Sequence, residues 1–128
     1  MKFMTMVRAS ENSGPPPKAL MDAIGQLGME AGKAGVMVQM GGLLPTATGA
    51  LVRLAGGDIT VTDGPFTETK EVIGGFAVYD VKSKAEAIDW SRRFLDLHRK
   101  HWPGWTGAVE LRQMFDPADF AGGMPPCK

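Results

Sequence analysis

The spacing of apolar side chains predicts the first two elements of the chain. Residues 2–8 mix apolar and β-branched side chains, with Thr5 and Arg8 on opposite parities, which predicts a strand buried mainly on one face. In residues 17–35 the apolar side chains instead recur at helical spacing, at Leu20, Ile24, Leu27 and Ala31. We therefore predict a helix there, with proline in its first turn and Gly35 as a left-handed stop.

Short apolar runs bounded by glycine and proline predict strands in the middle of the chain. Residues 36–45 predict a second strand, and the runs 50–54 and 58–62 predict a hairpin because a short glycine-bearing loop separates them. A turn-rich connector covers residues 63–75, and residues 76–81 predict another strand. This part of the chain is therefore mostly β-structure.

The second helix has the most clearly marked boundaries. Ser83 and Glu86 form a capping-box pattern, in which each side chain satisfies the other's backbone N–H, and the pair Pro103 and Gly104 marks the end. The last strand, residues 107–115, alternates cleanly. One face carries Val109, Leu111, Gln113 and Phe115, and the other carries Ala108, Glu110, Arg112 and Met114. The first set suits contact with the helices.

The order of these elements predicts an α+β protein, a ferredoxin-like sandwich in the split βαβ arrangement with an extra β-hairpin. Strands joined by a helix should run in parallel through a right-handed crossover, with both helices on one sheet face. The second face carries Met114 among polar residues, which makes it a candidate for packing against another subunit around a shared cavity. We predict one domain over residues 1–118, a tail over residues 119–128, and a homodimer.

Charge and composition argue against several classes of partner. The 128 residues carry 14 basic and 14 acidic side chains with no run of like charge, which argues against nucleic-acid binding. There is no apolar run of the roughly 18 residues that a membrane span needs, and we expect no secretion signal. The single cysteine, Cys127, fits a reducing compartment, so we expect a cytoplasmic protein.

The string Asp-Gly-Pro-Phe at residues 63–66 is distinctive, because a Glu, a Lys-Glu pair and a Gly-Gly-aromatic strand follow it. Together with the opening KFMTMVR, the strand LVRL and the ending VELRQMF, it resembles the DGPF subgroup of the YCII-related domain family. The resemblance implies a ferredoxin-like fold that dimerises into an α/β barrel, mostly in bacteria. It also implies genes that often lie beside those for extracytoplasmic-function sigma factors, and no established reaction.

The chain departs from the wider family at the residues suspected of catalysis. That family was suspected of enzymatic activity because of a His in the first helix and an Asp near the end of the second. Here the first helix has no histidine, and the second has Asp89 and Asp96 but ends in LHRKHWPGW. The His–Asp pair is therefore not carried over, and whether the chain is an enzyme stays open.

Asp63 is the sharpest candidate for chemistry. An Asp in a turn usually accepts from the N–H two residues on, but here that residue is Pro65, which has none. Its carboxylate must therefore bond Phe66, Thr67, a more distant donor or a ligand. The alternative is that Asp63 caps the short turn that follows it. In both cases the loop would present four side chains at the edge of a pocket: Phe66, Glu68, Lys70 and Glu71.

The charges after this loop have two interpretations. Glu68, Lys70 and Glu71 bring both signs of charge within a few residues, which suits proton transfer or carboxylate binding if burial shifts a pKa. The alternative is surface ion pairing.

Arginines on the strands form a second candidate group. Arg112 and Glu110 would line the dimer cavity, joined by Arg8 and Arg53 from other strands. A guanidinium there would hold a carboxylate or phosphate through two hydrogen bonds. The alternative is a structural salt bridge between subunits.

The end of the second helix carries histidines and tryptophans. His98 and His101 share a helix face, but two ligands do not make a metal site, which favours a structural role. Three tryptophans lie near this helix end in the sequence, and we expect them to pin the connection to the last strand: Trp90, Trp102 and Trp105. A role in stacking on a ligand is the alternative. We predict no metal and no cofactor.

Two functions follow from these residues. The first is a protein that binds, or also transforms, a small polar metabolite in a cavity near the DGPF loop and the dimer interface. Asp63 or Glu71 would then act as acid or base, and Arg112 as the anchor. The alternative is a non-catalytic accessory or regulatory protein that binds another protein, such as the sigma factor suggested by the family's gene context.

Overall fold

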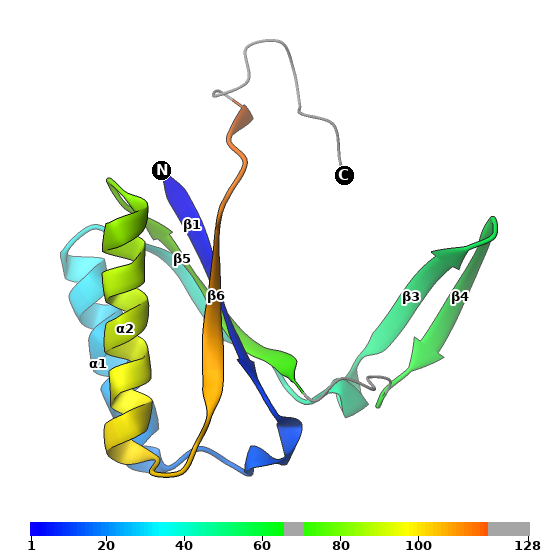
Figure 1. Ribbon diagram of the computed structural model, residues 1–128, viewed down its shortest axis with the longest axis horizontal. Coiled ribbons are helices and arrows are strands. Elements are labelled where there is room, and N and C mark those ends of the chain that lie inside the picture. The colour runs from blue at the N-terminus through cyan, green and yellow to red at the C-terminus, as the bar shows by residue number, and fades with distance from the viewer. Residues whose placement is uncertain (66–70, 118–128) are drawn as a thin grey trace.

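The computed structural model describes residues 1–65 and 71–117, so the predicted tail lies outside it (Figure 1). Within these residues the chain forms a four-stranded sheet, a separate two-stranded sheet and two α-helices. The strands are β1 (Lys2–Ala9), β2 (Met37–Gly42), β3 (Ala50–Ala55), β4 (Asp58–Asp63), β5 (Val72–Asp80) and β6 (Gly107–Gln113). The helices are α1 (Lys18–Lys33) and α2 (Lys84–His101), with short 3₁₀ turns η1 (Glu11–Ser13) and η2 (Thr46–Thr48).

The main sheet has the strand order β2–β5–β1–β6, and each neighbouring pair is antiparallel. Because β1 and β2 are both antiparallel to β5, they run in the same direction with β5 between them, which is the split βαβ arrangement. Both helices cover one face of this sheet (Figure 1). The predicted α+β class is therefore confirmed, and the strand order is consistent with a ferredoxin-like fold.

The core lies between the sheet and the helices. Phe3 of β1 and Tyr79 of β5 are register partners, both almost fully buried, and Leu111 of β6 packs on the same cluster. Ala31 of α1 and Ala87 of α2 are completely buried, because their small side chains let the helices approach the sheet closely. Leu111 lies on the helix side, so the predicted division of the last strand into two faces is confirmed.

Among the described residues no helix covers the other side of the sheet (Figure 1), and we call this side the open face. The register places Met6 of β1 beside Phe76 of β5 and Glu110 of β6, with Met4 beside Arg112. The open face therefore mixes apolar and charged side chains, as the alternation in the last strand predicted.

Local signals set the helix ends. Ser83 caps α2, because its Oγ accepts a hydrogen bond from the backbone N–H of Glu86 at 3.2 Å. The reciprocal half of the predicted capping box is not formed among the described residues, where Glu86 Oε2 is buried with no hydrogen-bond partner. Gly35 follows α1 with a φ of 76°, which confirms the left-handed stop. Pro17 is the residue before α1 and not part of its first turn.

The strand β5 is longer than predicted. It begins at Val72, so the last four residues of the predicted connector 63–75 belong to the strand. The two glycines in this part of the sequence resemble a turn, but strands on both sides pair with it. Ala9 of β1 pairs with Val72, and Gly42 of β2 pairs with Gly75. A Cβ at Gly75 would lie 3.1 Å from the carbonyl oxygen of Gly41, so glycine here allows β2 to come close.

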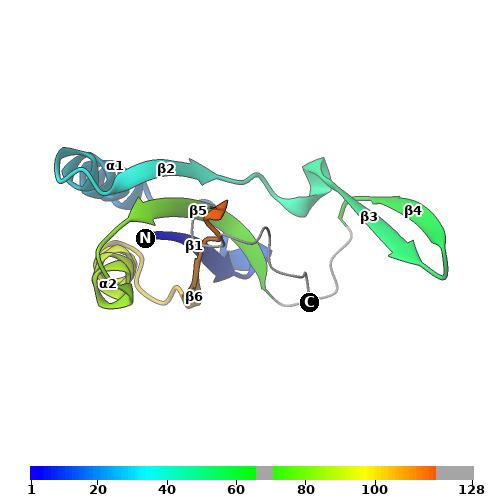
Figure 2. The same ribbon diagram turned by 90° about the horizontal axis from the view of Figure 1, so that it is seen from above.

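The predicted hairpin forms, but outside the main sheet. Strands β3 and β4 pair with each other in a sheet of their own. Gly56 and Gly57 have φ values of 59° and 83°, as a two-residue hairpin turn with two positive φ angles requires. The hairpin projects from the body on the side of the sheet away from the helices (Figures 1 and 2).

Candidate functional site

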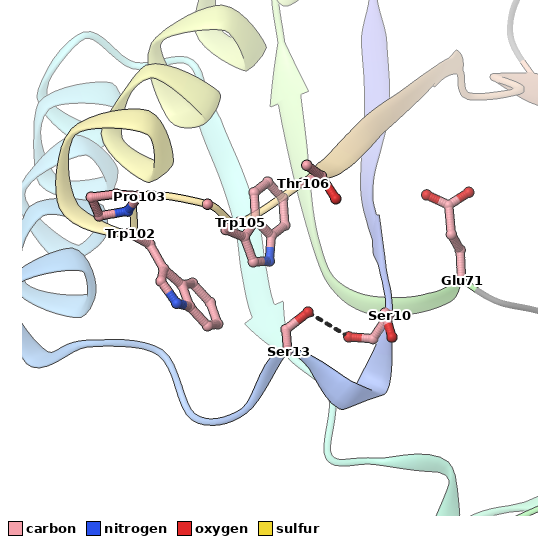
Figure 3. Close-up of a pocket in the computed structure, with 8 residues that line it drawn as sticks. Ser10, Ser13, Glu71, Trp102, Pro103, Trp105 and Thr106 are labelled. Atoms are coloured by element: carbon pink, nitrogen blue, oxygen red, sulfur yellow. Dashed lines mark hydrogen bonds between the residues drawn. The ribbon is translucent and has the colours of Figure 1, made fainter.

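A cavity of about 490 Å³ lies at the edge of the main sheet where β1 ends and where β5 and β6 begin. Segments far apart in the sequence form it: the turn after β1, the residue before β5, and the connection from α2 to β6 (Figure 3). Its lining comprises Ser10, Ser13, Glu71, Trp102, Pro103, Gly104, Trp105 and Thr106. Figure 3 shows the two tryptophans on one side and the Glu71 carboxylate across from them.

The α2–β6 connection holds the aromatic wall in place. The Trp102 and Trp105 rings stack with centroids 6.1 Å apart, and Trp105 also contacts the buried His98 ring at 4.3 Å. A Cβ at Gly107 would overlap the Trp105 ring, so glycine at the start of β6 makes room for the indole. These two tryptophans pin the connection, as expected, and they also line the cavity. Trp90 does not join them.

Trp90 lies earlier on α2 and packs on the core. Its ring stacks on Tyr79 at 5.9 Å, and the Arg93 guanidinium lies 4.7 Å from its centre. The prediction that Trp90 sits at the helix end is wrong, because eleven residues of α-helix separate positions 90 and 101 by roughly 16 Å.

Hydroxyl groups form the polar floor of the cavity. Ser10 Oγ accepts a hydrogen bond from the Asn12 N–H at 3.1 Å, which caps η1, and the Ser13 hydroxyl donates to the Ser10 carbonyl at 2.9 Å. In the first bond Ser10 acts only as an acceptor, so its own hydroxyl hydrogen can be donated to a ligand.

Arg8 lies between two carboxylates. Its guanidinium is 3.6 Å from Glu71 and 3.3 Å from Glu110, and all three side chains are about half exposed. We call Arg8, Glu71 and Glu110 the Arg8 cluster. Among the described residues, this cluster sets two carboxylates against one guanidinium beside the cavity. The structure thus joins Arg8 to two candidates that the sequence had placed in separate groups.

The other candidate residues lie apart from this cluster. Arg112 is on the open face two positions beyond Glu110, opposite Met4, and Arg53 is on the projecting hairpin. Asp63 ends β4 opposite Ala50 and does not line the cavity. Three candidates lie outside the described residues: Phe66, Glu68 and Lys70. The two interpretations of Asp63 therefore both stand, since its expected backbone partners belong to that segment.

The loop that carries Asp63 is tied to η2. The Gly64 N–H donates to the Gly49 carbonyl at 2.9 Å, and the Gly64–Pro65 peptide bond is cis. Both Glu11 carboxylate oxygens accept from Thr46, from its N–H at 2.6 Å and its hydroxyl at 3.0 Å. The start of η2 is therefore fastened to the turn that forms the cavity floor.

Sequence reasoning missed the serines and the threonine of the cavity. Ser10 and Ser13 belong to the polar segment that breaks the chain after the first strand, and Thr106 precedes the last strand. The capping pattern of Ser10 was readable, but its nearness to Trp105 depends on β1 and β6 being neighbours in the sheet. No local signal carries that information.

His98 is a structural group. It is 6% exposed, and its Nδ1 lies 3.0 Å from the Phe94 carbonyl oxygen. Because a carbonyl only accepts, Nδ1 carries the hydrogen of that bond. Burial lowers the pKa of His98 from its ordinary value, and the bond to Phe94 offsets part of this effect. Among the described residues no group of three or more His, Cys, Asp or Glu could hold a metal ion.

The sheet order and the helix layer define the chain as a two-layer α+β protein with a split βαβ arrangement. The model of the YCII-related domain family matches residues 1–94, and the chain belongs to that family. An uncharacterized protein of Rhizobium meliloti (strain 1021) is 35% identical over 94 residues, which are 73% of this chain and 69% of that protein. No described helix has the length and apolar character needed to cross a membrane.

The family match covers only part of the cavity lining. Arg8 and Glu71 lie within the matched residues, whereas Trp102, Trp105 and the whole of β6 lie beyond residue 94. The family match therefore does not extend to the aromatic wall.

Proposed function

We propose that the protein binds a small polar molecule in the cavity beside Glu71. The observation that carries the proposal is the lining itself, in which two indoles face a carboxylate above a floor of hydroxyl groups (Figure 3). More of the exposed lining is polar than apolar, which favours a polar ligand over an apolar one. An aromatic wall opposite a carboxylate suits a ligand with a flat or cationic part and a polar end.

Within this proposal Glu71 is the candidate acid or base, and the proposal leaves the question of an enzyme open. Of the two carboxylates predicted for that role, Glu71 lines the cavity and Asp63 does not. Arg8 orients the Glu71 carboxylate from 3.6 Å. Neither Arg8 nor Arg112 lines the cavity, so the proposal assigns no arginine as an anchor for an acidic group.

We further infer that the chain is a cytoplasmic protein of the DGPF subgroup that forms the dimeric α/β barrel implied by its resemblance. Support comes from the string Asp63-Gly64-Pro65-Phe66 and from the open face, where Met6 and Phe76 lie side by side with no helix layer over them. A second sheet packed there would bury these side chains.

Native mass spectrometry of gently purified, tag-free protein tests the proposal first. Any retained molecule adds to the measured mass and is identified by it. That molecule is then titrated into the wild type, Glu71→Gln and the control Glu30→Gln, whose carboxylate pairs with Arg93 on the helices. We expect affinity to fall about tenfold or more for Glu71→Gln and to stay unchanged for Glu30→Gln.

Other outcomes contradict the proposal. Equal loss in both variants would show that Glu71 has no special role. A protein that retains no small molecule, and whose melting temperature no small amine or carboxylic acid shifts, has no such site. A stoichiometric protein partner in the spectrum would instead favour the accessory function. The absence of a histidine in α1 is consistent with that alternative.

A further inference from the structure

The hairpin β3–β4 carries an apolar face that no described residue covers. The register pairs Val52 with Val61 and Leu54 with Ile59, so all four side chains lie on one face of the hairpin. They are 65–70% exposed. The other face is mostly polar and carries Arg53, Asp58, Thr60 and Thr62. This alternation is the pattern of a hairpin with one buried side.

Such a hairpin is not expected to be stable alone. Two strands without a packing partner are marginal in water, and strands β3 and β4 pair only with each other among the described residues. An exposed row of aliphatic side chains on a projecting element marks an interaction surface. The occupant must therefore come from outside the described residues.

The direction of the hairpin indicates which surface it meets. It projects on the side of the sheet opposite the helices, the same side as the open face (Figures 1 and 2). Among the described residues, the open face also carries apolar side chains with no helix over them, including the partly buried Met6 and Phe76. A second copy approaching the open face would thus meet the hairpin as well.

We propose that this hairpin is an arm that packs across the open face of a second copy of the chain, while the arm of that copy packs across the first. Both surfaces belong to one chain, so a two-fold dimer satisfies each of them twice.

The area requirement supports this arrangement. A stable interface buries about 800 Å² per partner, with about 20–30 residues on each side. The four aliphatic side chains of one arm fall short of this, so a dimer needs a second contact surface, for which the open face is the candidate. The inference therefore adds a second contact surface to the sheet packing proposed above and does not depend on any ligand.

Single charges test the arm. We would compare the full-length wild type with Ile59→Asp on the apolar face and with the control Thr60→Asp, its exposed neighbour on the polar face. Sedimentation equilibrium should show dimers for the wild type and Thr60→Asp. The dissociation constant of Ile59→Asp should rise about 100-fold, since each dimer carries two altered contacts. Circular dichroism checks that each variant keeps its helices.

A mixing experiment identifies the surface that the arm contacts. Met6→Asp places a charge on the open face, so it should weaken the dimer as Ile59→Asp does. A mixed dimer of these two variants has one arm–face contact with both charges and one with none. Native mass spectrometry should therefore show the mixed dimer in excess of either homodimer.

Three results would overturn the inference. A monomeric wild type at micromolar concentration would mean that something other than a second copy covers the arm, such as the chain's own C-terminal segment. An unchanged dissociation constant for Ile59→Asp would show that the dimer forms without any contribution from the arm. A mixed dimer no stronger than the homodimers would show that arms do not contact open faces. None of these results bears on ligand retention, so the proposed function is tested separately.

Discussion

Gly64 lies where the end of the hairpin passes the backbone of η2. Its N–H donates to the Gly49 carbonyl at 2.9 Å, and a Cβ at this position would overlap the Thr46 carbonyl group. The φ of Gly64 is not among the positive values. Glycine is therefore required by space and not by backbone conformation, which gives the second residue of the Asp-Gly-Pro-Phe string a physical role.

A methyl group at Gly64 should therefore destabilise the protein. We expect Gly64→Ala to lower the free energy of unfolding by about 1–3 kcal/mol, the usual cost of overpacking, as measured by urea denaturation. The control is Gly25→Ala in α1, where a Cβ would meet no atom within 4 Å. That variant should raise the free energy of unfolding by about 0.5–1 kcal/mol. Equal effects from both variants would contradict the steric explanation.

His98 should make stability depend on pH. Its folded pKa is lowered from 6.5, mainly by burial, so below about pH 6.5 the unfolded chain binds a proton that the folded chain resists. The stabilisation present above pH 6.5 is therefore lost as the pH falls toward the folded pKa. We expect the melting temperature to drop between pH 7 and pH 5.

The variant His98→Asn should flatten this pH dependence, although the loss of ring contacts with Trp105 also lowers its stability at every pH. His101→Gln keeps the buried imidazole and should keep the wild-type slope. If His98→Asn keeps the slope too, another group is responsible.

Among the elements, α2 has a start that depends on one side chain. Ser83 Oγ accepts a hydrogen bond from the Glu86 N–H. Among the described residues, the Glu86 side chain does not accept the reciprocal hydrogen bond from the Ser83 N–H. The full stabilisation of a capping box is thus absent, and that of a simple cap remains.

Removing this cap should cost about 1 kcal/mol in the free energy of unfolding. We expect this loss for Ser83→Ala in urea denaturation. Ser83→Asp keeps an acceptor in place and should retain most of the stability. A loss of the same size in both variants would mean that the hydroxyl matters for another reason.

The elements themselves were largely predictable. Helical spacing located α1 and α2, apolar and β-branched runs bounded by turn residues located β1, β3 and β4, and alternation located β6. The first part of β5 was missed because Gly74 and Gly75 resemble a turn. Their strand conformation comes from pairing with β1 and β2, which a local pattern does not reveal.

At the scale of the whole molecule, the cavity and the arm both depend on how distant segments of the chain are arranged. The cavity joins residues near positions 10, 71 and 105, and the arm leaves the body between β2 and β5. The cavity depends on β1 lying between β5 and β6, and the base of the arm is tied to the turn after β1 through the hydrogen bonds from Thr46 to Glu11. A change that displaced β1 would therefore affect the cavity and the direction of the arm together.

The sequence by itself determined the α+β class, the helix ends at Ser83 and Gly35, the hairpin turn and the candidate Glu71. These depend on side-chain period, backbone conformation and local hydrogen bonds, which neighbours along the chain specify. Only the tertiary structure decided that Arg8 meets Glu71 and that Trp105 faces a cavity. The physical reason is that strand pairing brings together residues that no local interaction connects.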